Sequence, residues 1–205
     1  MAENRLYWLN HGTTGAYRLS LSSTRCDDPR PYNSFGNGSA MRVSPVGWVF
    51  DTIDETIAEA ERSAAVSHNH PEGIKGAQAT AAAIYLARTG AGREDIRREI
   101  TKRFSYDLER SVAEIRPDYH FNETCQGAVP EALIAFLDAD DFAHTLRLVI
   151  SLGGDADTQG AIAGAVAEAF WDGLPEDIET EVDSILPGDM KTVVDDFEQS
   201  IQPAH

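Results

Sequence analysis

The chain has 205 residues, of which 42% are hydrophobic and 25% are charged, and its formal net charge is -17 at pH 7. This length predicts one domain with a sizeable core, and the composition is typical of a soluble globular protein. The acidic balance argues against direct nucleic-acid binding, because a protein that holds a phosphate backbone needs a basic face.

Targeting and cysteine signals favour a cytoplasmic protein. No apolar run is long enough to span a bilayer, and the start of the chain does not read as a signal peptide, so we expect no membrane partner. Cys26 and Cys125 form neither a metal-ligand pattern nor a disulfide framework. They are predicted to be free thiols, and a single bridge between them is the alternative.

Residues 1–30 show neither helical nor strand periodicity and are expected to form an irregular N-terminal segment, whereas residues 31–205 are expected to form a helical domain. Thr52 and Glu55 have the spacing of a capping box, and Pro130, Asp140-Asp141 and Pro175 mark later helix starts. No convincing strand and no internal repeat are present, so the expected fold class is all-α, a compact multi-helix bundle. Helices with both ends indicated are expected over residues 52–66, 76–88, 94–104, 159–171 and 189–199. Three more are expected to begin at residues 130, 140 and 175.

A glycine-rich loop from Tyr32 to Arg42 is the first candidate binding motif, and it leads into an expected helix. Exposed backbone amides at such a junction bind phosphate and other anions. In this loop Asn37 is suited to reach a sugar hydroxyl and Phe35 to stack on a base. The alternative is a plain turn, since Gly-Asn-Gly is good turn chemistry.

Two histidines, His68 and His70, follow the helix expected over 52–66. A zinc site is a poor interpretation, because two histidines leave a tetrahedral set incomplete and no cysteine or third histidine lies nearby. The better interpretation is that one histidine lines a polar pocket or caps the preceding helix. In such a pocket a neutral imidazole could contact a diphosphate or a ribose.

The densest group of oxygen ligands is Asp155, Asp157 and Thr158, in a turn that begins with two glycines. Two carboxylates and a hydroxyl so close together suit a hard divalent cation such as Mg²⁺ or Mn²⁺. The turn precedes the helix expected over 159–171, whose dipole favours negative side chains at its start. Ordinary helix capping is the alternative. Gly160 and Gly164 predict a thin helix that packs against another backbone.

Together, the glycine-rich loop, the Ser-His-Asn-His-Pro-Glu-Gly segment and the Gly-Gly-Asp-Ala-Asp-Thr turn resemble the ADP-ribosylglycohydrolase family in order and spacing, over roughly residues 28–198. The resemblance implies an all-α protein with a two-metal Mg²⁺ or Mn²⁺ site. Such a protein hydrolyses the N- or O-glycosidic bond between ADP-ribose and a protein side chain or related acceptor. It also implies that Asp155, Asp157 and Thr158 are metal ligands and that His68 lines the ADP-ribose pocket. The loop residues that it assigns to ADP-ribose are Ser34, Phe35, Gly36, Asn37, Gly38 and Ser39.

The chain departs from the family pattern near its start. The early acidic motif and the Thr-Asp-Asp run that supply the remaining metal ligands in the family do not occur, and Asp27-Asp28 lies too close to the glycine loop to replace them. We therefore expect an N-terminally truncated member with an incomplete two-metal site. The expected function is an ADP-ribosyl hydrolase acting on ADP-ribosylated protein, with no catalytic acid or base assigned.

Two alternatives to the hydrolase stay open. One is an impaired ADP-ribose-binding remnant, and the other is a structural relative without a ligand, because a fold can persist without its chemistry. The acceptor, the activity of this chain alone and a homodimeric state also stay open.

Overall fold

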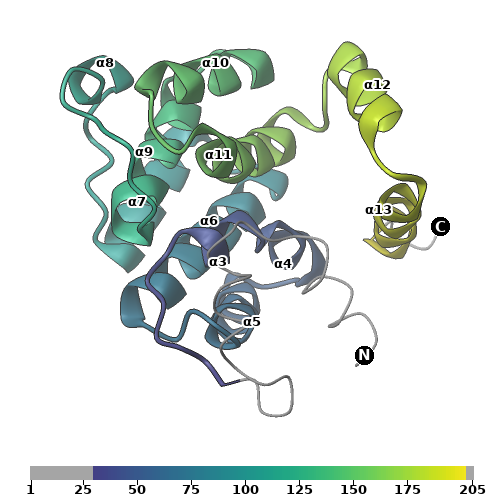
Figure 1. Cartoon of the computed structure of the whole chain (residues 1–205), viewed down its shortest axis with the longest axis horizontal. Coiled ribbons are helices and arrows are strands. Elements are labelled where there is room, and N and C mark those ends of the chain that lie inside the picture. The colour runs from purple at the N-terminus through teal and green to yellow at the C-terminus, as the bar shows by residue number, and fades with distance from the viewer. Residues whose placement is uncertain (1–29, 202–205) are drawn as a thin grey trace. The chain divides into compact units, whose positions relative to one another are not determined.

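The regular structure of residues 30–201, the part of the chain that this computed structural model describes, consists of helices and one isolated β-bridge between Gly36 and Thr124. The all-α prediction is therefore confirmed for these residues (Figure 1). Contacts divide the chain into a unit Met1–Pro31 and a unit Tyr32–His205, and the irregular segment expected over 1–30 lies, except for Arg30, outside the described residues. The helices are α3 (Gly38–Met41), α4 (Ser44–Val49), α5 (Ile53–Ala65), α6 (Pro71–Arg88), α7 (Arg93–Phe104), α8 (Val112–Ile115), α9 (Cys125–Asp138), α10 (Phe142–Leu152), α11 (Ala156–Trp171), α12 (Glu176–Ile185) and α13 (Gly188–Ile201).

Several helices begin at the capping residues that the sequence predicts. The Thr52 hydroxyl accepts a 3.2 Å hydrogen bond from the backbone N–H of Glu55 at the start of α5. The Asp141 carboxylate accepts one of 2.6 Å from the N–H of His144 at the start of α10. These caps satisfy donors that the first helical turn leaves without an intrahelical acceptor. α12 likewise follows directly after Pro175.

Helix α6 begins at Pro71, earlier than the expected start at residue 76. The ring of His70 accepts a 3.1 Å hydrogen bond from the N–H of Glu72, and proline suits the first helical position because its missing donor is not needed there. His70 therefore caps the helix that follows it, and the prediction that a histidine caps the preceding helix is wrong for this residue.

Helix α9 also begins earlier than predicted, at Cys125. Thr124 caps it by accepting a 3.2 Å hydrogen bond from the N–H of Gly127. The prediction of Pro130 as a first helical residue is wrong, because Pro130 lies inside α9. At that position its ring removes one backbone hydrogen bond, and the surrounding buried residues of α9 offset this loss by tertiary packing.

Helix α6 is the central helix of the unit Tyr32–His205. It lies among its neighbours in Figure 1 and packs against α3, α4, α5, α7, α9 and α11. It buries Ile84 together with a run of alanines. Its small side chains allow close approach: a Cβ placed on Gly76 would lie only 2.4 Å from Sγ of Cys125 on α9. The glycine-rich loop leads into α3, which lies against α6, so the core supports the loop directly.

Helix α11 does not depend on its glycines for packing, contrary to the prediction. A Cβ on Gly160 would meet nothing within 4 Å, and a Cβ on Gly164 would have an ordinary contact of 3.6 Å with Leu146. The close approach lies instead in the preceding turn, where a Cβ on Gly154 would lie 2.4 Å from the ring of Tyr119.

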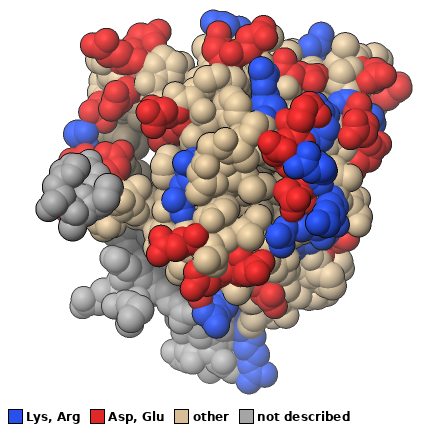
Figure 2. Space-filling model, turned by 180° about the vertical axis from the view of Figure 1, so that it is seen from behind, with Lys and Arg blue, Asp and Glu red and all other residues tan. Residues whose placement is uncertain are grey.

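The outer surface carries both signs of charge. Figure 2 shows acidic side chains spread over one face, with lysine and arginine side chains lying among them. On α7 the basic residues pair with acidic ones, as in the contacts Arg98–Asp95 and Arg103–Glu99. Within residues 30–201, none of the helices combines the length and the apolar character that crossing a bilayer requires.

Candidate functional site

The glycine-rich loop is anchored to the start of α9. The N–H of Asn37 donates a 2.8 Å hydrogen bond to the Glu123 carbonyl, and the N–H of Cys125 donates one of 2.9 Å to the Phe35 carbonyl. The Cys125 thiol adds a 3.1 Å contact to the Gly36 carbonyl. The backbone N–H of Asn37, one of the loop amides expected to be available to an anion, is therefore already used to hold the loop in place.

The side chains of the loop divide between structural and accessible positions. The Ser39 hydroxyl is buried and donates a 2.7 Å hydrogen bond to the carbonyl of Gly73 on α6. The Ser34 hydroxyl accepts a 3.1 Å bond from the N–H of Gly36 and so tightens the turn. The Phe35 ring is 46% exposed and meets His70 edge-on at 5.4 Å between centroids. Among these side chains, Phe35 is the one open to a stacking ligand.

The acidic turn meets the glycine loop directly. The side-chain amide of Asn37 donates a 2.7 Å hydrogen bond to Oδ2 of Asp155. Asp155 occupies the N-cap position of α11 but makes no side-chain capping bond, so ordinary capping does not explain it. α11 begins at Ala156, which places Asp157 and Thr158 in its first turn. The acidic turn therefore lies directly beside the glycine-rich loop.

The two carboxylates of the turn share one electrostatic environment. Burial raises the pKa of Asp155, and the neighbouring Asp157 adds to the rise, while the Asn37 hydrogen bond opposes it. The pKa of Asp157 is lowered, first by its hydrogen bond with Asp155 and then by the backbone N–H of Thr158, which donates at 3.0 Å. The charged form of Asp155 is therefore the disfavoured one, and a cation beside it would stabilise that form.

A divalent cation is only partly provided for by the described residues. Asp155, Asp157 and the Thr158 hydroxyl are hard oxygen donors of the kind that Mg²⁺ and Mn²⁺ prefer. Such a cation takes about six oxygen ligands. Residues 30–201 contain no group of three or more His, Cys, Asp or Glu side chains arranged to hold a metal. The donor type therefore fits such a cation, and these three residues would fill only part of its coordination shell.

His68 lies beneath the glycine loop and is held neutral. Burial, followed by the charge of Arg42, lowers its pKa to about 4. Arg42 donates a 2.9 Å hydrogen bond to the Ser67 hydroxyl, which lies 2.8 Å from Nδ1 of His68. The Ser67 hydroxyl donates to Nδ1 in one tautomer of the neutral ring and accepts from it in the other.

The Nε2 side of the His68 ring faces the loop. A Cβ on Gly38 would lie 3.4 Å from Nε2, and one on Gly36 would lie 3.6 Å from it. The structure thus brings His68, the loop and the acidic turn to one region, while Arg42 and Ser67 enter as residues that the sequence reasoning missed. Arg42 is the last residue of the glycine-rich loop motif and Ser67 is the first residue of the histidine segment, so both lie within motifs that the sequence had indicated.

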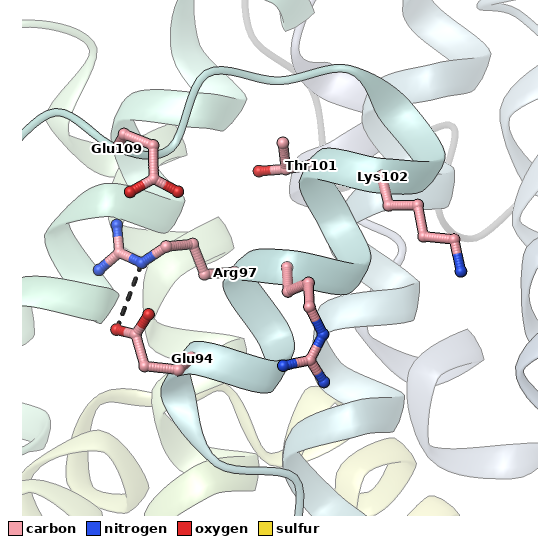
Figure 3. Close-up of a pocket in the computed structure, with 6 residues that line it drawn as sticks. Glu94, Arg97, Thr101, Lys102 and Glu109 are labelled. Atoms are coloured by element: carbon pink, nitrogen blue, oxygen red, sulfur yellow. Dashed lines mark hydrogen bonds and ion pairs between the residues drawn. The ribbon is translucent and has the colours of Figure 1, made fainter.

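Two surface grooves elsewhere contain none of the candidate residues. One, of about 400 Å³, lies along α7 and is lined by Glu94, Arg97, Arg98, Thr101, Lys102 and Glu109 (Figure 3). Its walls are charged, with Arg97 pairing Glu94 at 3.4 Å. The other, of about 510 Å³, lies between α5, α6 and the end of α7. Neither groove brings together the oxygen donors and loop that the candidate site combines.

Sequence comparison relates the chain to several proteins named as ADP-ribosyl hydrolases. It is 27% identical over 190 residues to the ADP-ribosylhydrolase ARH3 of Homo sapiens, covering 70% of this chain and 52% of that protein. It is 28% identical over 154 residues to the ADP-ribosylarginine hydrolase Tri1 of Pseudomonas putida, covering 68% and 40%. It is 27% identical over 175 residues to the ADP-ribosyl-[dinitrogen reductase] glycohydrolase of Rhodospirillum rubrum, covering 78% and 55%. The chain spans about half the length of these curated relatives.

Structural comparison agrees with the sequence. A solved structure described as an ADP-ribosylglycohydrolase-related protein complex matches with a TM-score of 0.66 and 26% identity, covering 85% of this chain and 64% of that chain. The family model described as ADP-ribosylglycohydrolase matches residues 1–204. With the loop, the buried histidine and the acidic turn assembled in one region, this all-α chain belongs to the ADP-ribosylglycohydrolase family.

Proposed function

We propose that this chain binds ADP-ribose between its glycine-rich loop and its acidic turn and acts there as an ADP-ribosyl hydrolase. The observation that carries the proposal is the 2.7 Å hydrogen bond between Asn37 and Asp155, because it joins the candidate nucleotide loop to the candidate metal ligands. The names of the relatives support release of ADP-ribose from a protein side chain, with modified arginine as the first acceptor to test.

The loop and His68 would hold the ADP-ribose. Ser34, Phe35, Gly36, Asn37, Gly38 and Ser39 supply the loop, and the exposed Phe35 ring offers a face to a base. A neutral His68 would present Nε2 to this region, as a hydrogen-bond donor or acceptor according to its tautomer. His68 is 3% exposed, so it would support the loop from its buried side, next to Gly36 and Gly38.

The acidic turn would hold the cation. Asp155, Asp157 and Thr158 are the residues that would bind Mg²⁺ or Mn²⁺, and such an ion supplies water activation and stabilisation of negative charge when bound. The Asn37 amide orients the Asp155 carboxylate, and the Thr158 backbone orients that of Asp157. The protein's own part is thus to fix two carboxylates before the ion arrives.

A second candidate function is ADP-ribose binding with little turnover. The observation that favours it is the small number of metal donors among the described residues. Binding rests on the loop, which is complete, whereas catalysis depends on charge that develops in the transition state and needs the whole cation site. An incomplete site would therefore reduce turnover far more than it reduces ADP-ribose affinity.

One preparation can separate these functions. We would titrate ADP-ribose by calorimetry and measure its release from ADP-ribosylated arginine, both with Mn²⁺. Asp157→Asn, in the first turn of α11, removes a candidate ligand, and Asp177→Asn, in the first turn of α12, is the matched control. Turnover lost in Asp157→Asn alone supports the hydrolase, and binding without turnover supports the second function. A wild-type chain that shows neither contradicts both.

A further inference from the structure

Two side chains outside the recognised motifs converge on Gly154, the residue just before Asp155. Tyr119 comes from the segment between α8 and α9, and Gln159 comes from the first turns of α11. A Cβ on Gly154 would lie 2.4 Å from Cε1 of Tyr119 and 3.1 Å from Oε1 of Gln159. Both side chains therefore lie close against Gly154, whose backbone leads into Asp155.

A hydrogen-bond chain fixes these two side chains. Gln159 donates from Nε2 to the Tyr119 hydroxyl at 2.9 Å, and that hydroxyl donates to the Gly127 carbonyl at 2.8 Å. Gly127 lies in the first turn of α9, the helix that also anchors the glycine-rich loop. The chain therefore ties the turn before α11 to the same support as the loop.

The burial of Gln159 is hard to explain by packing alone. Its side chain is fully buried, and its Oε1 has no hydrogen-bond partner within the described part of the chain. A buried amide oxygen without a partner costs free energy, so an apolar side chain of the same size would be the more stable choice for a purely structural role. Gln159 instead supplies the donor that orients Tyr119.

The acidic turn also affects the pKa of Tyr119. Burial raises the pKa of its phenol to about 12, and the charges of Glu131 and Asp155 add to the rise. The phenol therefore stays protonated and keeps its role as donor to Gly127 throughout the ordinary pH range. Because the phenol does not titrate in this range, its ring keeps the same position against Gly154.

We propose that Tyr119 and Gln159 are positioning residues for Asp155: they hold Gly154 so that the Asp155 carboxylate meets the Asn37 amide. This inference rests on the proposed function for its catalytic meaning. Its geometric content, the coupling of Tyr119 to the Asn37–Asp155 hydrogen bond, can be tested without metal or substrate.

The test uses the full chain labelled with ¹⁵N. The signal of the Asn37 side-chain amide is assigned by its loss in Asn37→Ser, and its shift and solvent exchange report the hydrogen bond to Asp155. Tyr119→Phe keeps the ring against Gly154 but removes the hydroxyl. Tyr85→Phe is the matched control, because the Tyr85 hydroxyl also donates to a backbone carbonyl, that of Asp51 at 2.9 Å.

We expect Tyr119→Phe to move the Asn37 signal toward that of a solvent-exposed amide and to speed its exchange, while Tyr85→Phe leaves it unchanged. We expect Gly154→Ala to move the same signal, because its new methyl group would collide with the Tyr119 ring. Where the wild-type chain binds Mn²⁺, Tyr119→Phe should weaken that binding by about tenfold, the lower end for loss of a residue that orients a ligand.

An unchanged Asn37 signal in both Tyr119→Phe and Gly154→Ala would overturn the inference. Equal signal changes in Tyr119→Phe and Tyr85→Phe would also overturn it, because they would indicate general loosening. A wild-type chain that binds no Mn²⁺ counts against the proposed metal site, yet the Asn37 signal still decides the positioning role. The two failures are therefore distinguishable.

Discussion

Asn37 and Asp155 are 118 positions apart in the sequence, and a 2.7 Å hydrogen bond joins the amide of one to the carboxylate of the other. Asn37 is 7% exposed, so the donor side of this bond is sheltered from water. A charge-assisted bond in such a place constrains both elements, because each loses a partner when the other moves. This contact therefore holds the glycine-rich loop and the acidic turn together.

Asn37→Ala should lower the free energy of unfolding by about 1 kcal/mol, since the half-exposed Asp155 recovers part of its hydration. It should also weaken ADP-ribose binding, because the loop loses its tie to the turn. Chemical denaturation and calorimetric titration measure the two effects. The control is Asn69→Ala, which removes an exposed 2.7 Å bond to the N–H of Asn33. Equal losses of ADP-ribose affinity in both variants would contradict the special role of Asn37.

His68 should make stability fall as the pH is lowered from about 6.5 to about 4. Its pKa in the folded chain is about 4, below the ordinary 6.5, so the unfolded chain binds more protons within this range. The free energy of unfolding therefore decreases with falling pH there, by on the order of 2 kcal/mol. Above the ordinary pKa both states are neutral and the contribution is constant.

The measurement is the difference in unfolding free energy between wild type and His68→Gln across this pH range, which cancels the titration of carboxylates common to both. We expect His68→Gln to flatten the slope. His120→Gln, at an exposed position, is the control for replacing a histidine. A wild-type slope that survives in His68→Gln would place the titrating group elsewhere.

Two helical glycines should respond in opposite ways to the same substitution. Gly76→Ala should destabilise the chain by about 1–3 kcal/mol, because the new methyl group collides with Cys125 across the α6–α9 contact. Gly160→Ala meets nothing within 4 Å and should stabilise α11 by up to about 1 kcal/mol through helix propensity. Thermal unfolding of the two variants checks the signs, and a stabilised Gly76→Ala chain would show that this contact can relax.

Cys125 should be unreactive in the folded chain. It is a free thiol that is fully buried, and burial raises its pKa to about 11, so little thiolate is present near neutral pH. In Cys26→Ser protein, where Cys125 is the remaining cysteine of the sequence, a thiol reagent at pH 8 should react only after unfolding in guanidinium. Rapid reaction of the native variant would indicate that α9 opens readily next to the loop.

Local signals determined much of this fold. The caps at Thr52 and Asp141 are visible in the sequence because a capping bond joins residues only two or three positions apart. The oxygen donors Asp155, Asp157 and Thr158 are likewise visible as a set because they are neighbours in the chain. Helix periodicity and the order of the three motifs were enough to indicate an all-α fold and its family.

Tertiary structure decided the rest. Whether α9 begins at Cys125 or at Pro130 depends on tertiary packing, because the buried residues around Pro130 offset the hydrogen bond that its ring removes. A glycine is required at Gly154, in the turn before α11, because Tyr119 packs against it there. It is not required at Gly160 inside α11, because nothing would meet a side chain at that position. The meeting of Asn37 with Asp155 likewise depends on how α3, α6, α9 and α11 pack. A sequence pattern reports the preferences of neighbouring residues, whereas such contacts form only when burial of the whole core brings distant segments together.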